Sequence, residues 1–278
     1  VRVENSAWAQ LDEAEQKFDA ARTRAVFVRQ GDVFVRHLQS KALTQITKSA
    51  ESEASPQFTS DGSGVLFKRG NDWYVWRSNG LTEPVLQLKA DSNPDKEPAV
   101  NAASAHELRL IATLARQKAD REALKTESEA RRNADGSSAI AASYLGKNVA
   151  IASSSLSPDA RYALVITTDK GADEGQTGKM PKYVTESGFE EFEEVRTRVG
   201  RNMPLAQKLW LVDVKTQRVR ELDFSALPGI AIDPLAGMRK TQKLEPLKGN
   251  RPVRMDFPTV WSADGSQAAL MVRTVDNK

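Results

Sequence analysis

The hydrophobic and polar positions of this 278-residue chain alternate in short runs that are separated by tight turns. One turn phrase recurs as Ser60-Asp61-Gly62, Ser157-Pro158-Asp159-Ala160 and Ser262-Ala263-Asp264-Gly265. An aromatic or apolar residue precedes each phrase, and a run of strand-forming residues follows it. Asp, Gly and Pro supply the backbone conformations of turns, so each phrase predicts two strands joined by a tight turn.

A second phrase follows the first and consists of an aromatic-rich strand, a polar turn and another short strand. It begins at Asp32-Val33-Phe34-Val35, at 72–76 and at 208–214. Together the two phrases make a four-stranded antiparallel unit. The 40 residues from Asp32 to Asp72 match the repeat length of one propeller blade. The sequence therefore predicts an all-β fold, a partial β-propeller of about three to four blades.

Counting these units gives a partial first blade at 25–47, a second at 55–88, a third at 148–222 and half of a fourth at 256–273. Because a propeller ring closes with about four to eight blades, we expect the array to be incomplete and to form the front of a larger protein. The expected organisation is an N-terminal helix over 1–23 and an incomplete propeller over 24–278.

Helices are predicted in two places. Residues 5–23 place Trp8, Leu11 and Phe18 on one side of a helix, with Ser6 as its cap. The propeller is interrupted by insertions at 95–135, 169–205 and 225–254. The first insertion is rich in Ala, Glu, Arg and Lys and predicts a charged helix whose apolar face holds Leu108, Ile111, Leu114 and Ala115. The other two are long enough to be functional or interaction loops.

Composition narrows the classes of protein. The chain is 40% hydrophobic, which excludes a disordered chain, and its formal charge of +3 gives no general argument for nucleic acid. No apolar run approaches the roughly 18 residues of a membrane span. The absence of cysteine excludes disulfides and thiolate chemistry. The first residues do not form a signal peptide, which favours a cytosolic chain or a mature, processed one.

Several segments together resemble the amino-terminal propeller of the prolyl oligopeptidase and dipeptidyl-peptidase family of serine peptidases, in bacterial exported members. They are the S-x-D-G turns, Leu209-Trp210-Leu211-Val212-Asp213-Val214, the loop 181–189 running into 195–200, and the stretches 227–230 and 233–235. The resemblance implies a propeller that gates access to an α/β-hydrolase domain of the same polypeptide, with peptides as substrates and a periplasmic or secreted location.

Catalytic residues are not predicted in this chain. The family's nucleophile lies in a G-x-S-x-G turn. The only glycines four apart here are Gly171 and Gly175, with Asp173 between them. His37 and His106 have no Ser and Asp partners at a recognisable spacing, and two histidines make no metal site. No cofactor is expected, and the catalytic domain is expected outside this chain.

An acidic cluster follows the resembling loop, at Glu190, Glu191, Glu193 and Glu194, with Phe189 and Phe192 among them. In dipeptidyl peptidases a propeller Glu pair binds the free amino terminus of the substrate. The resemblance therefore implies Glu190 and Glu191 as substrate-binding residues, since two carboxylates favour an ammonium. The alternative interpretation is a solvated edge, or a partner of Arg196, Arg198 and Arg201.

Two further features are interpreted as structural. Residues 239–254 carry a local charge of +5, but lack the aromatics that would stack on bases, so a solvated loop is favoured over a nucleic-acid site. The aromatic residues of the strands are expected to pack blade against blade rather than to form a recognition surface. They are Trp73, Tyr74, Trp76, Trp210 and Trp261.

Two functions remain open. The first is the gating and substrate-placing propeller of a prolyl-oligopeptidase-type serine peptidase, inactive by itself. The second is a non-enzymatic periplasmic propeller that serves as a protein-interaction module. Cleavage specificity, exopeptidase or endopeptidase action, and oligomeric state are not determined by the sequence.

Overall fold

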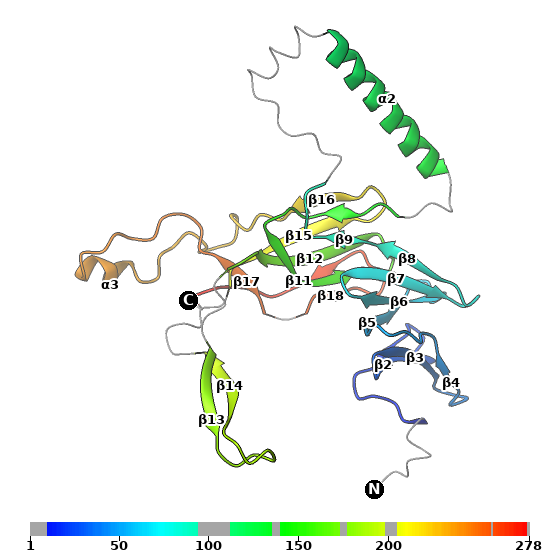
Figure 1. The fold of residues 1–278 in the computed structure, drawn as a ribbon, viewed down its shortest axis with the longest axis horizontal. Coiled ribbons are helices and arrows are strands. Elements are labelled where there is room, and N and C mark those ends of the chain that lie inside the picture. The colour runs from blue at the N-terminus through cyan, green and yellow to red at the C-terminus, as the bar shows by residue number, and fades with distance from the viewer. Residues whose placement is uncertain are drawn as a thin grey trace.

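The computed structural model describes residues 10–93, 112–134, 140–172, 177–197, 205–256 and 258–276. Two consecutive four-stranded antiparallel sheets come first along the chain (Figure 1). The first sheet consists of β1 (Lys17–Phe18), β2 (Arg24–Arg29), β3 (Asp32–His37) and β4 (Leu43–Gln45). The second consists of β5 (Glu53–Phe58), β6 (Gly64–Arg69), β7 (Asp72–Arg77) and β8 (Thr82–Leu86).

The third sheet has the same order, with β11 (Val149–Leu156), β12 (Tyr162–Asp169), β15 (Gln207–Asp213) and β16 (Arg218–Glu221). After it come two short antiparallel pairs. In one, β17 (Val253–Met255) pairs with β20 (Val272–Thr274). In the other, β18 (Val260–Trp261) pairs with β19 (Ala268–Ala269). The sheets are successive blades of a partial β-propeller, which confirms the predicted fold class.

Alternation along each strand buries opposite faces of a sheet against its two neighbours. In β6, Val65 and Phe67 pack toward the first sheet, whereas Leu66 packs toward the third. In β12, Ala163 and Val165 pack toward the second sheet. Leu164 and Ile166 of the same strand pack toward the final pairs. The core is therefore a series of layers between sheets.

Tryptophans join neighbouring sheets, as the sequence predicts. The Trp73 side chain of β7 is buried between the second and third sheets, and its Nε1–H donates to Ser154 Oγ at 3.0 Å. On the other face of β11, Trp261 Nε1–H donates to Ser155 Oγ at 2.9 Å. Adjacent serines of one strand thus bind indoles from the two neighbouring sheets. Tyr74 and Trp76 pack in the layer between the first and second sheets.

The tight turn that leads into the second strand recurs in all four units. Residues at the equivalent position have positive φ, of 52°, 68°, 57° and 76° for Arg22, Gly62, Ala160 and Gly265. The N–H of each donates to a backbone carbonyl three residues earlier, which belongs to Asp19, Thr59, Ser157 and Ser262 respectively. The sequence pattern does not reveal the first turn. Asp19 stands where the other turns have Ser or Thr, and Arg22 stands where they have Gly or Ala.

The predicted N-terminal helix is wrong over residues 11–23, where the chain forms β1 and this turn. Lys17–Phe18 form β1, which pairs antiparallel with β2, and residues 11–16 are not helical. The first blade is consequently a full four-stranded sheet, not a partial one. Trp8 and Ser6 lie outside the described residues. The Ala- and Glu-rich composition favours a helix locally, but pairing with β2 and the turn at Asp19 prevail.

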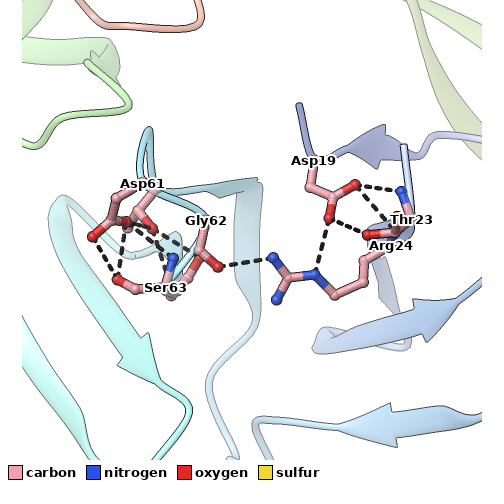
Figure 2. Close-up of polar contacts among 8 residues, drawn as sticks. Asp19, Thr23, Arg24, Asp61, Gly62 and Ser63 are labelled. Atoms are coloured by element: carbon pink, nitrogen blue, oxygen red, sulfur yellow. Dashed lines mark hydrogen bonds and ion pairs between the residues drawn. The ribbon is translucent and has the colours of Figure 1, made fainter. Parts of the chain in front are cut away.

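Contacts between successive turns hold the sheets in sequence. Arg24 of the first sheet donates from Nη2 to the Gly62 carbonyl of the second turn at 2.8 Å (Figure 2). The Ser60 N–H donates to the Pro158 carbonyl of the third turn at 2.8 Å. At Gly265, an added Cβ would lie 2.7 Å from Asp159 Oδ1, so only glycine permits this approach of the last turn to the third.

Asp19 organises the first of these contacts (Figure 2). Its Oδ1 accepts from the N–H groups of Thr23 and Arg24 at 2.7 and 3.0 Å, and its Oδ2 accepts from Arg24 Nε at 3.0 Å. Burial alone would raise the pKa of Asp19. The hydrogen bonds from Arg24 and Thr23 outweigh it and lower the pKa from 3.8 to about 2.

The insertions leave this scaffold at defined positions (Figure 1). β9 (Leu88–Lys89) and β10 (Ser143–Tyr144) pair in parallel where the first insertion leaves and returns. Within it, α2 (Ala112–Ala134) stands away from the sheets, as predicted for a charged helix. The predicted apolar face of this helix is not tested, because Leu108 and Ile111 and the side chains of Leu114 and Ala115 lie outside what the structure describes. No helix in the described ranges is long and apolar enough to cross a membrane.

The buried Asp19 carboxylate predicts an acid-dependent loss of stability. A lowered folded-state pKa stabilises the fold fully above the unfolded value, and this contribution is lost as pH falls from about 4 through about 2. We expect Asp19→Asn to cost about 1–3 kcal/mol at neutral pH and to flatten this part of the stability profile. Urea unfolding across this pH range measures both effects. Asp120→Asn on exposed α2 is the control, and equal acid sensitivity of Asp19→Asn and the unsubstituted protein would contradict the assignment.

Candidate functional site

A hairpin inserted into the third sheet carries the acidic cluster that the sequence analysis predicts as a candidate site. It consists of β13 (Thr177–Lys182) and β14 (Glu191–Thr197), which pair antiparallel. The hairpin is inserted between β12 and β15, whose own pairing continues to Thr168 opposite Gln207. We call residues 177–197 the arm. Figure 1 shows it projecting away from the sheets.

Hydrogen bonds within the tip shape the turn of the arm. Thr185 Oγ1 donates to the Phe189 carbonyl at 2.6 Å, and Gly188 N–H donates to the Thr185 carbonyl at 3.3 Å. Gly188 has φ of 71°, a conformation that favours glycine. Ser187 Oγ donates to Glu191 Oε1 at 2.7 Å. The tip is therefore a structured turn, although its side chains are largely exposed.

The two predicted substrate-binding residues lie at the end of this turn. Glu190 is exposed just before the strand, and Glu191 is the first residue of β14, directly opposite Lys182. Successive residues of a strand point to opposite faces. Glu191 therefore shares a face with Glu193, whereas Glu194 lies on the face of Phe192. The alternation distributes the acidic cluster over both faces of the arm.

The alternative arginine partners are not placed. Arg198 and Arg201 lie outside the described residues, as does the side chain of Arg196. Between 183 and 194 the sequence holds five glutamates and no lysine or arginine. Residues 183–194 of the arm therefore concentrate negative charge that attracts cations, although Lys182 and Lys179 of β13 lie opposite Glu191 and Glu194.

Large apolar side chains accompany this charge, which the sequence pattern only partly indicated. Tyr183, Val184, Phe189 and Phe192 are all between 63% and 89% exposed. The sequence includes Tyr183 and Val184 in the loop that resembles the family but gives them no binding role; the signal for one is a pair of apolar residues directly before a turn. Exposed apolar groups gathered on one projection are typical of a binding surface.

Among the described residues, His37 does not form a second candidate site. His37 is the exposed last residue of β3, and His106 lies outside the described residues. Over the ranges that the structure describes, no three His, Asp or Glu side chains gather as a metal site requires. Asp173 and Gly175 also lie outside these ranges.

Comparison with known proteins gives similarities of arrangement only. No protein-family model and no curated protein sequence matches this chain. Among solved structures, Porphyromonas gingivalis dipeptidyl peptidase 4 is similar over 93% of this chain and 29% of its own, at 10% identity and a TM-score of 0.41. The tricorn protease is similar over 94% of this chain and 24% of its own, at 10% identity and a TM-score of 0.33. TolB from Acinetobacter baumannii is similar over 95% of this chain and 52% of its own, at 12% identity and a TM-score of 0.27.

This chain thus spans less than a third of the two peptidases. These similarities include both peptidases and TolB and assign no function to this chain.

The exposure of the tip predicts that it contributes little to stability. Replacing residues 183–190 by Asn-Gly joins Lys182 to Glu191, which already face each other, through a two-residue turn. We expect the free energy of unfolding in dilute solution to change by no more than about 0.5 kcal/mol. Urea unfolding measures it, with buried Leu66→Ala as a variant that must lower stability. A large loss for the shortened arm would show that the tip packs on the sheets.

Proposed function

We propose that this chain is the gating and substrate-placing propeller of a prolyl-oligopeptidase-family serine peptidase that hydrolyses peptides. The α/β-hydrolase domain of the same polypeptide would supply the nucleophile and its acid–base partners. The observation that carries the proposal is the arm. Of the segments that resemble the family, 181–189 forms the end of β13 and the tip, and 195–197 lies in β14 of this exposed projection. A location in the periplasm or outside the cell belongs to the same proposal.

The proposed role of the arm is to hold the free amino terminus of a peptide. An ammonium would be attracted by the carboxylates of Glu190 and Glu191, in a run from 183 to 194 that holds five glutamates; Lys182, opposite Glu191, is the facing cation. Binding at one end of a peptide places the scissile bond at a fixed distance from that end. The propeller would thereby orient the substrate, while the hydrolase domain breaks the bond.

A second candidate function is a non-enzymatic propeller that acts as a protein-interaction module. The exposed apolar side chains of the arm favour it, because a surface of this kind buries area on contact with another protein. This function requires no catalytic domain.

A serine-directed fluorophosphonate label separates the two functions. The protein should be expressed from its natural gene and labelled before and after heat denaturation. We expect covalent labelling of the native protein only, at a serine outside residues 1–278, located by mass spectrometry of peptides. A native protein that takes no label would support the interaction module instead.

The Glu pair is tested in that same full-length enzyme. We expect Glu190→Gln with Glu191→Gln to raise KM at least tenfold for chromogenic dipeptides with a free amino group, because two carboxylates are lost from the ammonium site. KM for their N-acetylated forms should not change. Glu193→Gln with Glu194→Gln, on the same arm, is the matched control. Unchanged KM for the free amines would remove the role of the pair and leave the peptidase proposal standing.

A further inference from the structure

A second projection leaves the scaffold between the third sheet and β17. We call residues 225–252 the extension; the short helix α3 (Ala236–Thr241) lies within it (Figure 1). Its ends are brought together by the Arg251 N–H, which donates to the Ile230 carbonyl at 2.9 Å, and Ile230 is buried at this base. The predicted insertion extended to residue 254, but Arg254 lies in β17.

Asp233 orders the outer part of the extension, residues 232–248, which we call the basic tip. Its Oδ1 accepts from Leu235 N–H at 2.9 Å, and its Oδ2 accepts from Leu247 N–H at 3.1 Å. Arg239 Nε lies 3.1 Å from the same Oδ2, and the Arg239 carbonyl accepts from Leu244 N–H at 2.8 Å. The Leu247 hydrogen bond, together with that of Leu235 and the charge of Arg239, lowers the pKa of Asp233 below its ordinary value. The basic tip is thus held together by its own contacts.

The basic tip nevertheless exposes much of its apolar surface. Ile232, Met238, Leu244 and Leu247 are between 48% and 66% exposed. The hydrogen bonds of Leu244 and Leu247 fix both residues beside the Arg239–Asp233 pair, so these side chains belong to one ordered surface. Exposed apolar side chains gathered in this way are typical of a contact with another apolar phase.

Exposed cations lie among these apolar side chains. They are Lys240, Lys243 and Lys248, whereas Glu245 is the exposed acid of the same segment and Asp233 is paired with Arg239. The aliphatic stem of a lysine can lie along an apolar surface while its ammonium reaches a phosphate. The basic tip therefore combines the two features that attract a protein to an anionic lipid surface, which are apolar area and positive charge.

Charge and composition distinguish the basic tip from the arm and from a protein interface. The tip of the arm also exposes large apolar side chains, but residues 183–194 hold five glutamates, which an anionic surface repels. Protein interfaces are enriched in aromatic residues and depleted in lysine. Residues 232–248 hold three lysines and no Phe, Tyr or Trp. This composition favours lipid over protein as the occupant.

We propose that the basic tip docks on an anionic phospholipid surface. Its exposed apolar side chains lie at the boundary of headgroups and acyl chains, and its three exposed lysines pair with lipid phosphates. The contact is peripheral and reversible, and it holds the propeller at the membrane through the extension. The proposal goes beyond peptide hydrolysis and does not depend on it.

Vesicle flotation tests this contact on the protein expressed from its natural gene. We expect the protein to float with vesicles of phosphatidylglycerol and phosphatidylcholine in equal parts, but not with phosphatidylcholine alone, and added salt should weaken the binding. Lys240→Glu with Lys243→Glu should lower the partition coefficient roughly tenfold, because attraction becomes repulsion. Leu244→Ser with Leu247→Ser should lower it by about fivefold or more, because apolar contact is lost.

Matched controls carry the same changes elsewhere on the surface. Lys48→Glu with Lys147→Glu gives the same net charge as the lysine variant, and Leu81→Ser with Leu124→Ser removes two equally exposed leucines. Both controls should bind the anionic vesicles as the unsubstituted protein does. Equal midpoints of urea unfolding for all four variants show that each is folded.

Four results would overturn the proposal: no flotation with the anionic vesicles, equal flotation with phosphatidylcholine, losses no larger than those of the controls, or a loss for the lysine variant alone. If the protein does not float and hydrogen peroxide also leaves Met238 unoxidised in the native protein, the basic tip is covered by protein instead. Fluorophosphonate labelling requires no vesicles, so this proposal and the peptidase proposal fail separately.

Discussion

The burial of each sheet between its two neighbours is the constraint on which the rest of this structure depends. β12 shows it most clearly, because Val165 packs toward the second sheet while Leu164 packs toward the final pairs. A strand with two apolar faces is stable only when both are covered. Trp73 and Trp261 pack on the two faces of β11. The indole N–H of each donates a hydrogen bond to a serine of that strand. The stability of one blade is consequently shared with the next.

The turns between first and second strands preserve a conformation rather than a sequence. Gly62 and Gly265 adopt positive φ without steric cost, whereas Arg22 and Ala160 adopt it despite their side chains. In the first turn, Asp19 alone accepts backbone hydrogen bonds that Ser157 and Asp159 share in the third. Different residues therefore meet the same geometric requirement, and the contacts of neighbouring turns keep the sheets in register.

The residues of the inserted segments can vary because contacts at the base of each insertion keep the sheets intact. Below the arm, Thr168 and Gln207 still pair, and below the extension Arg251 binds the Ile230 carbonyl. β9 and β10 do the same for the first insertion. Exposed acidic and apolar residues at the arm therefore cost the core little. The substrate role proposed for Glu190 and Glu191 uses residues of one such projection.

The sequence by itself determined the blade pattern, because the period of two and the S-x-D-G turns are local features that each strand pair satisfies alone. It also determined that Trp73, Trp76, Trp210 and Trp261 pack between sheets and that a charged helix leaves the sheets. Tertiary structure decided what local pattern could not. Residues 17–18 became a strand because β2 offered a pairing edge, against a composition that favours a helix. Likewise, the faces of the arm follow from the register of β13 and β14, which sets Glu191 opposite Lys182 and divides an acidic run that is continuous only in the sequence.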